Sequence, residues 1–234
     1  MKVRPLYLML VLSFAVAAMA HPASGSDFLH SYKGTPYHDP HYTGGAQKIP
    51  GKVMCAYYDF GGEGVAYHDS DAKNNGSGAL NPADGTYLNE FRMNEGVDIS
   101  YTKFKRDPPI DDTQYDKMTP PADLLYVGWT VPGEWFRLTV DVARTADYSA
   151  DLLYTSNRGG AISIDVSGAP AAGPLTIPTT YDAKDPVAWR QWHHWNVVPK
   201  IARLHLTAGK NVLTIHIVEQ GQMNLAVFDF KRAE

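Results

Sequence analysis

From residue 124 to its end, the chain alternates short apolar segments with turn residues, and this pattern constrains the fold most. In residues 161–166 every second side chain is apolar, as in a strand with one buried face. Pairs such as Pro132-Gly133 and Ser167-Gly168 separate the segments with turn chemistry. We predict strands over residues 124–131, 134–142, 148–154, 161–166, 175–177, 192–198, 202–206, 211–218 and 224–230.

Many short strands, with neither helical periodicity nor a repeat, favour an all-β fold: a β-sandwich jelly roll of two antiparallel sheets. Residues 52–59, 64–68 and 97–101 also read as extended. We therefore assign residues 48–232 to one β domain, which follows a polar lead-in over residues 21–47. The side chains expected in its core include Leu204, Leu206, Val212, Leu213, Ile215 and Ile217.

Two polar stretches, residues 74–94 and 103–122, are longer than a compact domain needs for a connection. Loops of this length are commonly functional. They either wall a binding cleft or decorate the surface, and the sequence alone does not choose between these roles.

Residues 1–20 have the form of a secretory signal peptide. Lys2 and Arg4 precede an apolar stretch over residues 6–19, which ends in the small-x-small pattern of Ala18-Met19-Ala20. A membrane anchor is the alternative, although the apolar stretch is short for a span. We predict a secreted protein, extracellular or periplasmic, with no membrane contact in its mature form.

The composition argues against a disulfide-stabilised protein and against a nucleic-acid-binding one. Cys55 is the only cysteine, so no internal disulfide forms, and its apolar neighbours predict a buried side chain rather than a reactive thiol. A net charge of -4 leaves no basic footprint for nucleic acid.

The stretch over residues 188–195 reads AWRQWHHW and contains three of the five tryptophans, each three residues from the next. Residues i and i+2 share a face of a strand, so Trp189, Trp192 and Trp195 cannot all point into one core. Flat aromatic faces suit the apolar faces of sugar rings. Core packing at the end of a sandwich is the alternative interpretation.

Several motifs in one order resemble a family 6 carbohydrate-binding module over residues 48–231. These are GGEGVAYHD (61–69), EGVDI (95–99), YVGWT (126–130), GEW (133–135), the Gly159-Gly160 turn, WRQW (189–192), LTAGKNVLTI (206–215) and MNLAVFDF (223–230). The resemblance implies a jelly roll that binds polysaccharide without catalysis.

The same resemblance implies a site on the loops at one edge of the sandwich. Trp129 and Trp189 would clamp a sugar ring, and Asn224 would hydrogen-bond its hydroxyls. Tyr67 and Glu95 are weaker candidates for the rim of this cleft. Trp192 and Trp135 are expected in the core, and Trp195 has no assigned role.

The resembled family usually holds a structural calcium, but this chain has Met54, Ala56 and Ala226 where its ligands would be. We therefore predict no metal at that position and no cofactor. Calcium at the acidic loop with Asp107, Asp111 and Asp112 stays open. A metal role for His30, His38 and His41 is not favoured, because their spacing matches no ligand frame.

We expect non-catalytic binding of a polysaccharide or oligosaccharide, and no enzymatic activity. One alternative is a polysaccharide-degrading enzyme on a jelly roll, a glycosidase or lyase, although no pair of carboxylates is flagged as catalytic. The other is a module that adheres to glycans at a cell surface.

Overall fold

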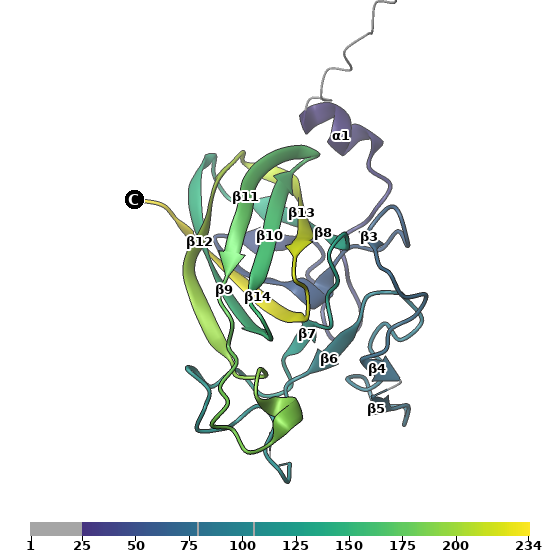
Figure 1. The fold of residues 1–234 in the computed structure, drawn as a ribbon. Coiled ribbons are helices and arrows are strands. Elements are labelled where there is room, and N and C mark those ends of the chain that lie inside the picture. Colours follow the sequence, from purple (N-terminus) through teal and green to yellow (C-terminus); the bar gives the residue numbers. More distant parts are fainter. Residues whose placement is uncertain (1–24, 79, 105) are drawn as a thin grey trace, which may run out of the picture.

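A computed structural model of the chain describes residues 25–78, 80–104 and 106–234. The predicted signal peptide lies outside these described residues. Figure 1 shows two layers of strands with a short helix, α1 (Gly25–Ser31), at one end and long loops at the other. Among the described residues, no helix has the length and apolar character needed to cross a membrane.

The first sheet has the strand order β1-β8-β13-β10-β11, with β3 also paired to β8. All of its described pairs are antiparallel except β1 with β8. Its strands are β1 (Gln47–Ile49), β3 (Tyr67–His68), β8 (Trp135–Val142), β10 (Gly160–Val166), β11 (Ala169–Ile177) and β13 (Gly209–Glu219).

The second sheet has the order β12-β9-β14-β7-β6, with β2 also paired to β14, and its described pairs are antiparallel. The two sheets form a β-sandwich of the jelly-roll type, which confirms the predicted fold class. The strands are β2 (Gly51–Met54), β6 (Ile99–Tyr101), β7 (Leu125–Val127), β9 (Ala146–Ser156), β12 (Asn196–Leu206) and β14 (Met223–Arg232).

The core lies between the sheets, where alternate apolar side chains point inward. Ile162, Ile164 and Ile215 of the first sheet belong to the same buried cluster as Leu152 and Phe228 of the second. All six residues predicted for the core from residue 204 onward are buried, which confirms that prediction.

Several strands differ in length from the sequence prediction: β3 and β7 are shorter, and β11 is longer. Two further segments differ in where the strand is broken. Residues 192–198 and 202–206 contribute to one strand, β12, because a register shift between Val198 and Ala202 absorbs the break that Pro199 introduces. The strand predicted over 52–59 ends at Met54, and a 3-10 helix, η1 (Cys55–Tyr57), follows. Cys55 is fully buried there, as predicted, and burial raises the pKa of its thiol.

The polar lead-in packs against the sandwich. Thr35 and Phe60 form an isolated bridge, and the Tyr37 ring is buried and stacks on Tyr57 at 5.0 Å between centroids. β1 then joins the first sheet. The packed domain therefore extends upstream of residue 48.

The loop over residues 74–94 has its own anchor. Asn74 Oδ1 accepts hydrogen bonds from the backbone N–H groups of Gly76, Ser77 and Ile99. A short pair of strands, β4 (Ser77–Gly78) and β5 (Asn81–Pro82), follows. These contacts hold the loop beside β6 and place residues 80–82 at the loop end of the sandwich.

Candidate functional site

A cavity of about 570 Å³ lies among the loops at the end of the sandwich. Four stretches of the chain line it, and both long loops contribute. The lining residues are Leu80, Asn81, Pro82, Ser100, Lys103, Arg106, Ile110, Tyr126, Trp129, Trp189, Trp192 and His193.

Three tryptophans meet in this cavity. Trp189 projects from a 3-10 helix, η2 (Ala188–Arg190), with 55% of its surface exposed. Trp129 follows β7 and is partly exposed, and Trp192 is also only partly buried. The structure therefore brings together the two aromatic residues expected at a sugar site and adds a third.

Trp192 was predicted to be a core residue, and that prediction is wrong. Backbone hydrogen bonds of the 3-10 type run from Arg190 to Val187, from Gln191 to Ala188 and from His193 to Arg190. A 3-10 turn has three residues, so side chains at i and i+3 lie on the same side. The three-residue spacing of Trp189 and Trp192 fits this turn.

The backbone at Trp129 adopts the left-handed conformation, with φ of 48°. Such a conformation is uncommon in residues other than glycine and costs on the order of 1–3 kcal/mol. Gly76 lets the ring approach the loop over 74–94, because a Cβ there would lie 2.9 Å from Trp129 Cζ3. The surrounding loops therefore hold Trp129 in a strained position at the cavity.

Trp195 completes the tryptophan stretch as a core residue. Its side chain is fully buried beside Tyr126 and Ala226, and its Nε1 donates a 2.6 Å hydrogen bond to Asp111 Oδ1. The same carboxylate oxygen lies 2.7 Å from His193 Nε2, and Oδ2 accepts a hydrogen bond from the Lys103 backbone N–H. The loop over residues 103–122 is thus fastened to the tryptophan stretch.

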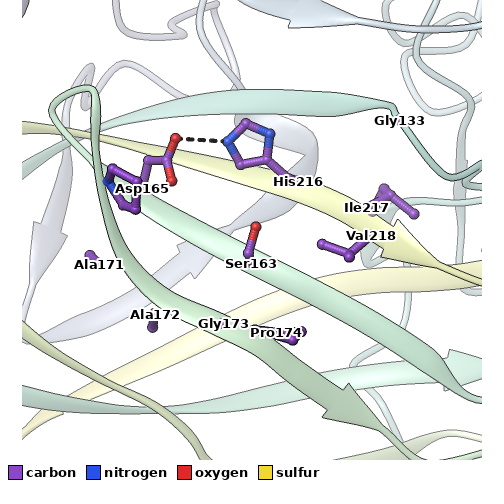
Figure 2. A pocket seen from close by; sticks show the side chains of 11 residues that line it. Gly133, Ser163, Asp165, Ala171, Ala172, Gly173, Pro174, His216, Ile217 and Val218 are labelled. Carbon is purple, nitrogen blue, oxygen red and sulfur yellow. Dashed lines mark hydrogen bonds and ion pairs between the residues drawn. The ribbon is translucent and has the colours of Figure 1, made fainter. Parts of the chain in front are cut away.

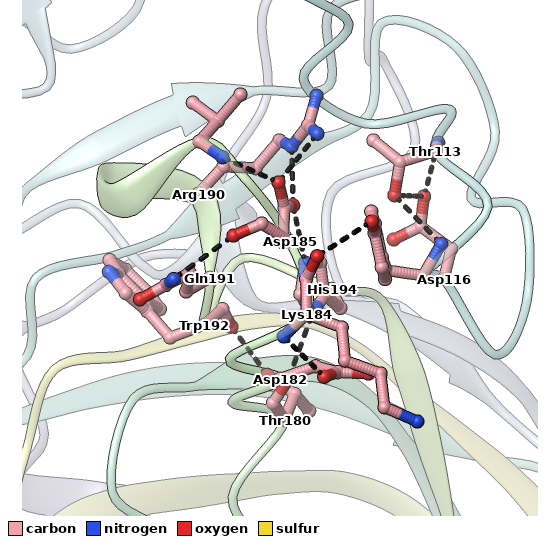
Figure 3. Close-up of polar contacts among 12 residues, drawn as sticks. Thr113, Asp116, Thr180, Asp182, Lys184, Asp185, Arg190, Gln191, Trp192 and His194 are labelled. Carbon is pink, nitrogen blue, oxygen red and sulfur yellow. Dashed lines mark hydrogen bonds and ion pairs between the residues drawn. The ribbon is translucent and has the colours of Figure 1, made fainter.

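A second anchor holds the residue next to Trp189. Arg190 is buried and makes two hydrogen bonds to Asp185, of 2.6 and 2.7 Å, as Figure 3 shows. Arg190 also donates to the carbonyl oxygen of Pro109. Its hydrogen bonds to Asp185 are the main cause that holds the pKa of the Asp185 carboxyl below its usual range. His194 Nε2 lies 2.9 Å from the same carboxylate. The turn that carries Trp189 is therefore rigidly supported.

Asn224 lies one layer beneath the cavity. It is 1% exposed, and its Nδ2 donates to Thr155 Oγ1 at 2.8 Å and to His193 Nδ1 at 2.9 Å. Its Oδ1 is one of two buried side-chain polar atoms without a hydrogen-bond partner in the described part of the chain. Asn224 supports His193, which lines the cavity, and is not itself among the lining residues.

The structure does not bring Tyr67 and Glu95 to this cavity. Tyr67 lies on β3 of the first sheet, where its hydroxyl accepts a hydrogen bond from the Gly96 N–H. Glu95 pairs with Arg92 at 2.7 Å and accepts a hydrogen bond from Tyr58. Neither residue lines the cavity, so their placement on the cleft rim is wrong.

Trp135 also departs from its expected place. Instead of being buried in the core, its ring is partly exposed on β8, with the Arg137 guanidinium 4.4 Å from the ring centroid. The sequence interpretation missed Lys103, Arg106 and His193 of the cavity. The available signal was the position of the loop over 103–122, directly upstream of the Trp129 segment.

The residues that replace the calcium ligands of the resembled family are packed among apolar side chains. Met54 and Ala226 share a cluster with Trp195, and Ala56 is fully buried in the main core. Asp111 uses both carboxylate oxygens for N–H donors. Within residues 25–78, 80–104 and 106–234, no group of three or more His, Cys, Asp or Glu side chains is placed to hold a metal ion.

A wider hollow of about 800 Å³ lies over β10, β11 and β13. Figure 2 shows its central polar pair, in which His216 Nε2 lies 2.9 Å from Asp165 Oδ2. Prolines, alanines and glycines supply most of its lining, and no tryptophan or tyrosine belongs to it. The candidate site is therefore the tryptophan cavity.

No known family model matches the chain, and no curated protein matches it. Among solved structures, it is similar to a carbohydrate-binding module of Clostridium stercorarium in complex with cellobiose, with 12% identity, 82% of this chain and 100% of that chain covered, and a TM-score of 0.49. A family 35 module of Clostridium thermocellum gives 18% identity, coverage of 50% and 86%, and a TM-score of 0.38. A module of the Cellvibrio mixtus lichenase 5A in complex with cellotriose gives 22% identity, coverage of 47% and 79%, and a TM-score of 0.37.

Proposed function

We propose that this protein binds oligosaccharide or polysaccharide chains in the tryptophan cavity without breaking them. The observation that carries the proposal is the meeting of Trp129, Trp189 and Trp192 in one cavity, with Trp189 largely exposed. Exposing a large apolar ring to water is costly unless a ligand covers it. Burial of apolar area contributes roughly 25 cal/mol per Å².

The cavity also has groups that suit sugar hydroxyls. Ser100, Asn81 and His193 line it beside the indole rings. Each hydrogen bond to a neutral hydroxyl adds only about 0.5–1.5 kcal/mol net of water. We infer that aromatic contact supplies most of the affinity and that these polar groups select among sugars. Asn224 acts indirectly, by holding the His193 ring through the 2.9 Å hydrogen bond.

The rigid support of the site favours a binding role. Arg190 and Asp111 fix both ends of the tryptophan stretch, so little side-chain entropy is lost when a ligand binds. Export of the protein, as residues 1–20 predict, would expose this site to polysaccharides outside the cell.

The test is a glycan array probed with the wild type, Trp189→Ala and a control, Trp135→Ala, which removes a partly exposed tryptophan outside the cavity. We expect glycan binding that Trp189→Ala abolishes and Trp135→Ala retains, with melting curves showing that both variants fold. Equal binding by wild type and Trp189→Ala would contradict the proposal. Release of reducing or unsaturated ends from a bound glycan would establish the enzyme alternative instead.

A further inference from the structure

The cavity lining is cationic as well as aromatic. Lys103 and Arg106 both face the cavity, and its lining residues within the described ranges include no Asp or Glu. Both cations come from the loop over residues 103–122. The protein as a whole has a net charge of -4, so this concentration of positive charge is local.

Lys103 is held in place. Its Nζ donates to Ser100 Oγ at 2.9 Å and lies 4.1 Å from the centroid of the Tyr101 ring. The carboxylate of Asp111, in the same loop, is already occupied by contacts with Trp195, His193 and the Lys103 backbone N–H. An ammonium group has three donors, and Lys103 has no carboxylate partner for any of them.

Several other cations of the described chain have such partners. Lys48 pairs with Asp141, Arg92 with Glu95, Arg190 with Asp185 and Lys231 with Asp151. Neither Lys103 nor Arg106 belongs to an ion pair among the described residues. Two neighbouring cations in a partly buried cavity repel each other and create a positive local potential. A negatively charged group on a ligand would offset this repulsion.

We propose that the cavity selects sugars that carry an acidic group, a carboxylate or a sulfate, and that Lys103 and Arg106 recognise this group while the tryptophans cover the ring. This inference rests on the proposed function. A partly buried hydrogen bond between opposite charges is stronger than one between neutral groups, so the acidic group determines which glycan binds best.

Two pairs of probes separate the charge from the sugar. One pair is an oligogalacturonate and its neutral methyl ester, and the other is a sulfated galactan oligosaccharide and its desulfated form. Calorimetric titration at low and raised salt compares the wild type with Lys103→Gln, Arg106→Gln and the control Lys210→Gln, an exposed lysine outside the cavity. Melting curves check that each variant folds.

We expect the acidic form of at least one pair to bind about tenfold tighter than its neutral form, with weaker binding at raised salt. Lys103→Gln and Arg106→Gln should remove most of this preference, and Lys210→Gln should retain it. Preference for the carboxylate or for the sulfate pair identifies the acidic group. Equal or tighter binding of both neutral forms overturns the inference and leaves the proposed function standing. Failure of every probe, together with failure of the glycan array, removes the proposed function itself.

Discussion

The indole nitrogen of Trp195 donates a 2.6 Å hydrogen bond to Asp111, a residue 84 positions earlier in the chain. This contact fastens the loop over residues 103–122 to the tryptophan stretch, since His193 meets the same oxygen. Lys103 and Arg106 come from one of these segments and Trp189 and Trp192 from the other. Asp111 therefore joins the cationic part of the site to its aromatic part.

Replacement of Asp111 should disrupt this junction. Asp111→Ala leaves the Trp195 and His193 N–H groups without their buried acceptor, and we expect the free energy of unfolding to fall by about 2–4 kcal/mol. Urea denaturation measures this change. Asp112→Ala is the matched control, because its side chain is exposed, and equal stability of the two variants would show that the junction contributes little.

Trp192 and Trp195 should respond differently to truncation. Trp195→Ala removes a fully buried ring and should cost about 3–5 kcal/mol of stability. Trp192→Ala removes a partly exposed ring of the cavity and should weaken glycan binding about tenfold with a much smaller loss of stability. Thermal melting and calorimetric titration of the same samples separate the two effects. If Trp192→Ala loses much stability but binds glycan as the wild type does, Trp192 is a core residue and not part of the binding site.

The buried pair of Arg190 and Asp185 should be sensitive to both mutation and acid. Arg190→Lys cannot reproduce the two parallel hydrogen bonds, and we expect a loss of about 2–4 kcal/mol together with weaker glycan binding. Because the folded-state pKa of Asp185 is lowered, its carboxylate stabilises the fold at pH values above the ordinary aspartate pKa. This stabilisation is lost as the pH falls from that value towards the lowered folded-state pKa. Acid denaturation curves should show the wild type losing this advantage over Arg190→Lys at low pH. If the acid denaturation curves of the two proteins run parallel, the Arg190–Asp185 pair does not contribute this pH-dependent stability.

The charge of Lys103 should give acidic ligands a pH dependence. Its pKa is lowered to about 8, mainly by burial; Asp111 opposes this shift and the nearby Arg106 adds to it. Ser100 and the Tyr101 ring contact its ammonium, and Tyr126 and His193 line the same cavity. Lys103 is charged below its pKa, so affinity for an acidic glycan should fall as pH rises from about 7 to 9, and affinity for a neutral one should not. Calorimetric titrations of the wild type and Lys103→Gln with an acidic glycan across this pH range measure the change in affinity. The affinity of the variant should not depend on pH in this way. An equal pH dependence in both proteins would contradict the role of Lys103.

The fold could be predicted because strand alternation is a local property of the sequence, and β8, β10, β13 and β14 lie where their patterns indicate. The convergence of Trp129 and Trp189 was expected from the resemblance to a carbohydrate-binding module. The position of Trp192 was not, because its turn was interpreted as part of a strand and core. Lys103 and Arg106 could not be assigned, since a charged loop has no periodic signal and its path depends on the distant contact of Asp111 with Trp195.

The most direct test of the central claim is calorimetric titration of wild type and Trp189→Ala with the glycan that binds best on the array. Trp189 is largely exposed and contributes little to the core, so its removal should leave the melting temperature nearly unchanged. We predict that binding weakens at least about tenfold in the variant. Equal affinities for the two folded proteins would contradict a glycan site at this cavity.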